Sequence, residues 1–133
     1  MDEEQYVQEF YLLPNEKKLI VICSVYETEA EDGTPYAMAR MIWDPSTTQV
    51  ITYDVSDIEN PKEIGNIRQS GNYSTSRLSD GHLYLFSSYS TGGDFAKEEP
   101  ELYIPTVDAK LIEAENIYLP DTDRGCMYEV ITS

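Results

Sequence analysis

Apolar and polar residues alternate with a period of two along much of the chain, which is typical of strands in an antiparallel sheet. In residues 48–55, Val50, Thr52 and Asp54 fall on one side, and Ile51, Tyr53 and Val55 fall on the other. Similar alternation or short β-branched runs predict strands over residues 6–13, 17–28, 36–43, 48–55, 62–68, 73–79, 82–89 and 126–132. The pattern therefore predicts an all-β fold of antiparallel hairpins and meanders.

One of these segments is apolar on both sides. The run from Leu19 to Tyr26 contains almost no polar residue, so a strand there would have no face suited to water. A strand that is buried on both faces lies in the middle of its sheet. We therefore predict that the strand over residues 17–28 has a neighbour on each side.

Turn formers separate the predicted strands. Asp44-Pro45-Ser46-Thr47 predicts a tight turn before residues 48–55, and the acidic stretch from Glu27 to Gly33 predicts an exposed loop. Asp80-Gly81 predicts a two-residue type I′ hairpin between residues 73–79 and 82–89. Counting outward from this turn gives the register, which pairs Ser79 with His82, Leu78 with Leu83, Arg77 with Tyr84, and Thr75 with Phe86.

The segment from Asp54 to Pro61 is the densest cluster of turn formers. We assign structural turn roles to Asp54, Asp57, Asn60 and Pro61, because aspartate and asparagine side chains can bond to nearby backbone amides. Calcium is the alternative, since carboxylate oxygens are its preferred ligands. Candidate ligands are Asp54, Asp57 and Glu59 in this turn and Asp121 and Asp123 in a later one. Neither cluster has the spacing of an Asp-rich calcium loop, so we expect no metal and no other cofactor.

The final third of the chain breaks the strand pattern. Val107, Leu111 and Ile112 would share one face of a helix, and Pro105 and Pro120 would bound it. We therefore predict one or two helical turns within residues 107–117.

Composition and charge narrow the function classes. Eleven tyrosines against three phenylalanines and one tryptophan favour half-buried strand positions. The net charge of −16, from nine basic and twenty-five acidic residues, would repel nucleic acid and anionic lipid and attract cations or basic partners. Because no apolar run reaches the length of a membrane span, we expect no direct membrane insertion, and the N-terminal residues do not resemble a signal peptide.

The sequence contains few residues arranged as in a catalytic site. His82 is the single histidine and follows a turn glycine, which predicts an exposed strand residue and not part of a serine triad. Cys23 and Cys126 lie in apolar runs without a basic neighbour, so nothing suggests a reactive thiolate. Paired carboxylates could hydrolyse glycans, but with this many acids close pairs arise by chance. We predict a protein without a catalytic site and keep a carboxylate-dependent glycan hydrolase as the alternative.

The segment from Thr48 to Asp57, followed by Asn60-Pro61-Lys62, Gly71, Ser76-Arg77 and Leu83-Tyr84-Leu85, resembles the repeat of a bacterial secreted β-propeller family. Tyr103-Ile104-Pro105, Ile117-Tyr118 and Pro120 are similar to that family's long insertion. The resemblance implies an extracellular or envelope-associated protein that binds a protein or glycan ligand or acts as a scaffold. A purely structural segment of a larger ring is a further alternative.

The resemblance also implies how the chain is divided. Residues 1–133 would form a single propeller fragment, with one blade portion in residues 1–70. Residues 71–133 would hold the next hairpin, the long insertion and the start of a further strand. In such a fragment the strands over residues 6–13 and 126–132 would lie at unpaired edges, so edge-mediated self-association is an expected alternative to a monomer, favoured as salt screens the charge.

Overall fold

The computed structural model describes residues 3–27, 46–90, 104–119 and 127–133. Regular structure in these residues is almost entirely antiparallel strand, as predicted. The elements are β1 (Glu3–Leu13), β2 (Lys18–Glu27), β3 (Thr47–Asp54), β4 (Lys62–Ser70), β5 (Asn72–Ser79), β6 (His82–Ser90), β7 (Thr106–Val107), β8 (Lys110–Leu111), a 3₁₀ helix (Ala114–Asn116) and β9 (Met127–Thr132).

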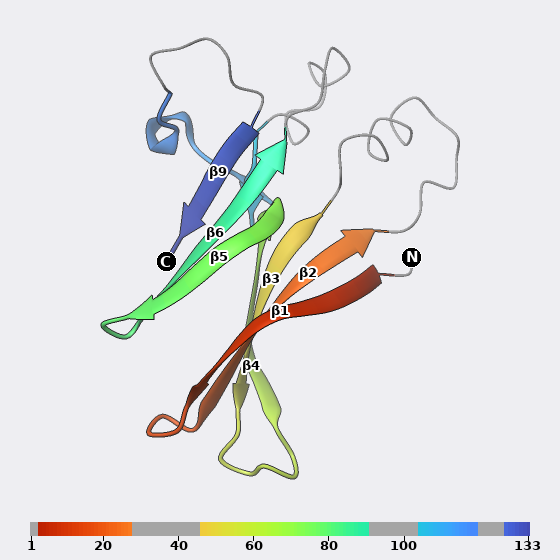
Figure 1. Cartoon of the computed structure of the whole chain (residues 1–133), viewed down its shortest axis with the longest axis vertical. Helices are drawn as coiled ribbons and strands as arrows, with labels where there is room; N and C mark the ends of the chain where they lie inside the picture. The colour runs from red at the N-terminus through yellow and green to blue at the C-terminus, as the bar shows by residue number, and fades with distance from the viewer. Residues whose placement is uncertain (1–2, 28–45, 91–103, 120–126) are drawn as a thin grey trace.

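The first four strands form a meander in chain order. The sheet runs β1-β2-β3-β4-β7-β8, with every neighbouring pair antiparallel. Figure 1 shows these four long strands twisting together. β2 lies between β1 and β3, which confirms that the apolar run from Leu19 to Tyr26 belongs to an internal strand.

The remaining long strands form a second sheet in the order β5-β6-β9. Asp80 and Gly81 have φ values of 50° and 78°, the left-handed backbone that a type I′ turn requires at both central positions. The predicted register is confirmed in all four pairs. Near the other end of the hairpin a bulge lies between Tyr73 and Thr75.

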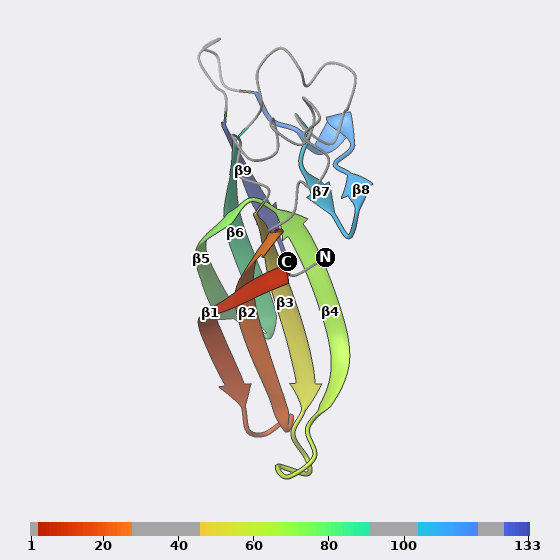
Figure 2. The same ribbon diagram turned by 90° about the vertical axis from the view of Figure 1, so that its right-hand side faces the viewer.

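The two sheets lie against each other (Figures 1 and 2), and a small apolar core lies between them. The buried residues of the core are Ile20, Ile22, Val50 and Leu85, and Tyr11, Leu13, Tyr73 and Leu83 pack around them. Gly71 links β4 of the first sheet to β5 of the second. Its φ of +100° and the 2.5 Å that a Cβ would leave to the Ser88 carbonyl oxygen require a glycine there.

Of the one or two helical turns predicted within residues 107–117, the structure has a single 3₁₀ turn, and the helical face predicted from Val107, Leu111 and Ile112 is wrong. Thr106–Val107 and Lys110–Leu111 form a small hairpin whose two turn residues, Asp108 and Ala109, have φ values of 49° and 60°. A backbone hydrogen bond from Asp108 to the Arg68 carbonyl (2.7 Å) and one from the Arg68 amide to the Asp108 carboxylate (3.0 Å) attach the hairpin to β4. Pairing with a sheet edge therefore outweighs the helical spacing of three apolar residues. Only the 3₁₀ turn of Ala114–Asn116 retains helical geometry in this interval.

Several predictions fall outside the described residues. These are the strand over residues 36–43, most of the loop from Glu27 to Gly33, and the start of the turn at Asp44-Pro45. Of that turn, Ser46 is described before the strand, and Thr47 already belongs to β3.

Candidate interaction surfaces

A buried amide joins the two sheets. Gln69 in β4 is 1% exposed. Its Nε2 donates to the Ser87 hydroxyl (2.8 Å) and to the Val130 carbonyl (3.3 Å), and its Oε1 accepts from the Thr132 hydroxyl. The Ser87 hydroxyl in turn donates to the Ser70 carbonyl at 2.7 Å. Because this polar group is buried and fully bonded, it fixes β6 and β9 relative to β4 instead of destabilising the interface.

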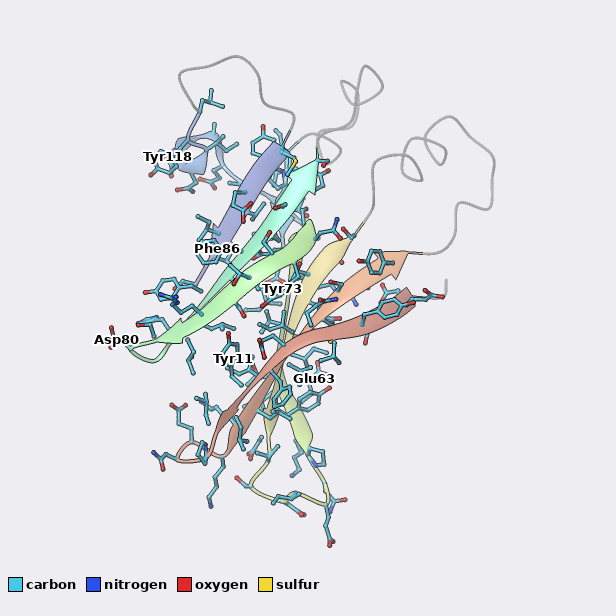
Figure 3. The ribbon with its side chains drawn as sticks, viewed as in Figure 1. Tyr11, Glu63, Tyr73, Asp80, Phe86 and Tyr118 are labelled. Carbon is cyan, nitrogen blue, oxygen red and sulfur yellow. The ribbon has the colours of Figure 1, made fainter. Side chains whose placement is uncertain are left out.

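A second polar contact lies between the sheets nearer the hairpin tips. The hydroxyls of Tyr11 in β1 and Tyr73 in β5 lie 2.8 and 3.0 Å from the Ser76 Oγ. Figure 3 shows Tyr11 and Tyr73 pointing into the space between the two sheets. The tyrosines here act as packing residues with a bonded polar end, so this cluster has a structural role.

The outer face of the six-stranded sheet carries exposed apolar side chains. Tyr11 and Leu13 pack inward, so Phe10 and Leu12 point outward from the same strand. A bulge between Val7 and Glu9 absorbs one residue, which places Val7 on this outer face as well. Val7, Phe10 and Leu12 are 64%, 62% and 59% exposed. We call these three residues the β1 apolar row.

Polar side chains continue across the same outer face. Hydrogen bonds run from Gln5 to Gln49 (3.2 Å), from Gln49 to Asn66 (2.8 Å) and from Asn66 to Glu63 (3.1 Å). This series connects β1, β3 and β4. The outer face therefore combines an apolar row at the β1 edge with an ordered series of amides.

The outer face of the three-stranded sheet is aromatic and hydroxyl-rich. Leu85 and Ser87 point inward, so Tyr84, Phe86 and Ser88 point outward. Tyr84 lies beside the His82 ring, with ring centroids 6.3 Å apart. Ser88 lies 2.8 Å from the Ser74 hydroxyl and donates to the Glu129 carboxylate at 2.9 Å.

The predicted turn residues lie at the hairpin ends. Asp54 accepts a hydrogen bond from the Ser56 amide at 2.8 Å, and the hydrogen bonds from Ser56 hold the pKa of Asp54 below its usual value. Asp57 accepts from the Glu59 amide at 3.1 Å and from the Asn60 side chain at 3.0 Å. Pro61 directly precedes β4, where its missing N–H removes no ladder bond. Asp80 lies at the tip of the β5–β6 hairpin (Figure 3), and Gly81 is the second of the two residues between these strands.

Other candidate residues show no site geometry. His82 is exposed at the start of β6. Cys23 is 4% exposed, and burial raises the pKa of its thiol. In the part of the chain that the structure describes, no three His, Cys, Asp or Glu side chains lie together as metal ligands. Asp121, Asp123 and Cys126 lie outside that part.

Sequence reasoning missed the long-range side-chain contacts between the two sheets and within the six-stranded sheet. Gln69 and Ser87 occupy ordinary positions within strands, and only the packing of the two sheets brings them into contact. Glu3 and Arg68 are 65 residues apart and form a two-point ion pair. No local motif could have indicated either contact, because each depends on strand order.

No helix within the described ranges is long and apolar enough to cross a membrane.

Comparison with known proteins identifies the family. Searches of curated proteins and of solved structures each gave no match. A family model described as "Beta propeller domain" matches residues 1–133. Together with the antiparallel sheets stacked face to face, this match establishes that the chain belongs to the beta propeller domain family.

Proposed function

We propose that this chain is a non-enzymatic propeller segment that serves as a binding or scaffold module outside the cell or in the cell envelope. The observation that carries the proposal is the exposed β1 apolar row, Val7, Phe10 and Leu12. Apolar side chains gathered on one exposed surface are typical of interaction sites. The extracellular setting rests on the resemblance of residues 48–85 to the repeat of secreted bacterial propellers.

The ligand is a protein or a glycan. An aromatic ring on the same face as ordered amides suits both classes, since Phe10 offers a flat apolar surface and the series from Gln5 to Glu63 offers hydrogen-bonding groups. The net charge of −16 disfavours nucleic acid and anionic lipid surfaces. No cofactor or metal is required for this role.

The test measures binding and hydrolysis in the same samples. The chain is mixed with insoluble cell-wall glycans and with envelope protein immobilised on beads, and both depletion from solution and release of reducing sugar are followed. We expect depletion on one class of material without reducing-sugar release. Phe10→Ser should weaken the depletion several-fold, whereas Ile58→Ser, which removes an 85% exposed apolar residue from a turn, should leave it unchanged.

The other outcomes separate the alternatives. Release of reducing sugar that is lost in a carboxylate variant would establish the glycan hydrolase. If no material depleted the chain from solution, the result would favour the alternative that the chain is a purely structural segment. Equal binding by the Phe10→Ser and Ile58→Ser variants would mean that the binding surface is not the β1 apolar row.

A further inference from the structure

Two buried residues of β2 lie on the outer face of the six-stranded sheet. Ile20 and Ile22 belong to the core between the sheets, and side chains alternate between the two faces of a strand. Cys23 and Val25 therefore point to the outer face. There they are only 4% and 1% exposed, so other side chains cover them.

The covered residues adjoin the β1 apolar row. Cys23 lies opposite Val7 of β1 on one side and opposite Gln49 of β3 on the other. Val7 is 64% exposed, whereas Cys23 beside it is 4% exposed. On one face of the sheet, exposure thus falls from nearly two-thirds to almost none between neighbouring strands. The cover begins where the β1 apolar row ends.

Polar side chains cross β2 on this face. The Gln5 amide in β1 donates to the Gln49 side chain in β3 at 3.2 Å, so this bond passes over β2. Arg68 in β4 donates two hydrogen bonds of 2.9 Å to Glu3 in β1, so this contact passes over both β2 and β3. Figure 2 shows the N-terminal end of β1 crossing in front of these two strands. Within the described residues, these contacts form a polar layer above the outward side chains of β2.

This polar layer is weaker than the sheet beneath it. The Glu3 and Arg68 side chains remain 34% and 38% exposed, and an ion pair that water screens contributes little to stability. The contact between Gln5 and Gln49 is a single neutral hydrogen bond. The strands, in contrast, are paired by the backbone along their whole length. The polar layer can therefore open while the strands stay paired.

We infer that the Glu3–Arg68 ion pair is a latch over Cys23 and Val25, which opens while the sheet stays folded. In the open form the two uncovered residues extend the β1 apolar row onto β2. The latch thus regulates how much apolar surface a ligand can contact, and this consequence rests on the proposed function. A ligand that contacts both strands favours the open form, because it binds that form more tightly.

Alkylation of Cys23 measures the opening without any ligand. The reagent is iodoacetamide, which is uncharged and is therefore not repelled by the net charge of −16. Mass spectrometry of the labelled peptides separates Cys23 from Cys126. Below the unfolding transition we expect a rate that does not depend on urea, because a local opening exposes little surface. A rate that rises exponentially from the lowest urea concentrations would mean that Cys23 reacts only after global unfolding, and it would overturn the inference.

Two variants remove the ion pair from opposite sides. Glu3→Gln and Arg68→Gln should each speed the alkylation of Cys23 about two- to fivefold, the factor expected for an exposed ion pair. Loss of a nearby carboxylate favours the thiolate, whereas loss of a guanidinium disfavours it. Rate changes of opposite sign would therefore assign the effect to charge, and no change in either variant would mean that other groups cover Cys23. Both results would overturn the latch.

The double variant tests whether the two residues act together. Because Glu3→Gln and Arg68→Gln remove the same contact, the double variant should react about as fast as either single variant. Multiplication of the two effects would mean that each residue acts on Cys23 separately, which contradicts a shared latch.

Gly81→Ala is the matched control. It strains the turn of the β5–β6 hairpin in the other sheet, where φ is +78°, and leaves the latch in place. It should lower the overall stability without changing the alkylation rate at low urea. Equal acceleration in Gly81→Ala and Glu3→Gln would mean that a general loss of stability exposes Cys23. Failure of the latch is distinguishable from failure of the proposed function, because alkylation needs no ligand and depletion on glycan or protein depends on Phe10.

Discussion

The Arg68 guanidinium in β4 donates two hydrogen bonds, each 2.9 Å long, to the Glu3 carboxylate in β1. β2 and β3 lie between these strands, so the pair spans the outer face of the six-stranded sheet. The hydrogen bond from Arg68 lowers the pKa of Glu3. The contact ties the first strand of the meander to the fourth, which the backbone ladder does not do directly.

This ion pair predicts a stability term that depends on pH. Both side chains remain about one-third exposed, so water screens the pair, and Glu3→Gln should lower the free energy of unfolding by about 0.5–1 kcal/mol at neutral pH. The carboxyl pKa is lower in the folded chain, so this contribution is present above the unfolded value of about 4.3. It is lost as pH falls through the folded pKa. Urea unfolding of both proteins from pH 3 to 8 measures the difference.

The control for this experiment removes a similar charge elsewhere. Glu59→Gln changes an exposed carboxylate in the turn after β3 and should have a smaller effect on the free energy of unfolding. If the two variants gave the same pH profile, net charge and not the Arg68 contact would explain the result.

Three glycines should respond differently to alanine. In Gly71→Ala, a Cβ would lie 2.5 Å from the Ser88 carbonyl oxygen in a backbone with φ of +100°, so we expect a loss of about 3 kcal/mol or more. In Gly81→Ala, φ is +78° but the surroundings are open, and the cost should be about 1 kcal/mol. In Gly65→Ala, the nearest atom is 3.6 Å away, and stability should hold or rise by about 0.5 kcal/mol. Denaturant unfolding ranks the three variants, and a different order would refute this explanation.

The parts of the fold that local physics determines were predictable from sequence. Asp80-Gly81 determines the register of the β5–β6 hairpin, because a two-residue turn with left-handed backbone at both positions permits one pairing. The apolar run from Leu19 to Tyr26 indicates an internal strand for an equally local reason. In both cases the signal lies within the segment whose place in the sheet it indicates.

The parts that depend on strand order were not predictable. Helical spacing is present in Val107, Leu111 and Ile112, yet residues 106–107 pair with the edge of β4 as a strand. No local sequence feature indicates that this edge lies nearby. The same holds for Gln69, whose three partners come from β6 and β9. The outer faces follow from alternation alone, but which face is outer is known only once the two sheets are stacked.

Gln69→Leu should be among the most destabilising polar substitutions in the chain. Leucine has a similar volume but leaves the Thr132 hydroxyl and the Val130 carbonyl without this partner in a buried place. A loss of about 2–4 kcal/mol in the free energy of unfolding is expected. Gln8→Leu, at an exposed position in β1, should change stability by less than about 0.5 kcal/mol. Similar values for the two variants would contradict the role given to Gln69.

The turn from Asp54 to Pro61 should hold its shape without a metal ion. Asp57 accepts hydrogen bonds from the Glu59 amide and the Asn60 side chain, so its carboxylate already has partners. Asp57→Ala should therefore lower the free energy of unfolding by about 0.5–2 kcal/mol, by analogy with the loss of a helix N-cap. Glu59→Ala removes the same charge from the same turn but leaves these bonds in place, and it should cost much less. Melting temperatures with millimolar calcium and with chelator should agree for the unaltered chain and for both variants. A rise with calcium that disappears in Asp57→Ala would instead assign the carboxylates of this turn to a calcium site.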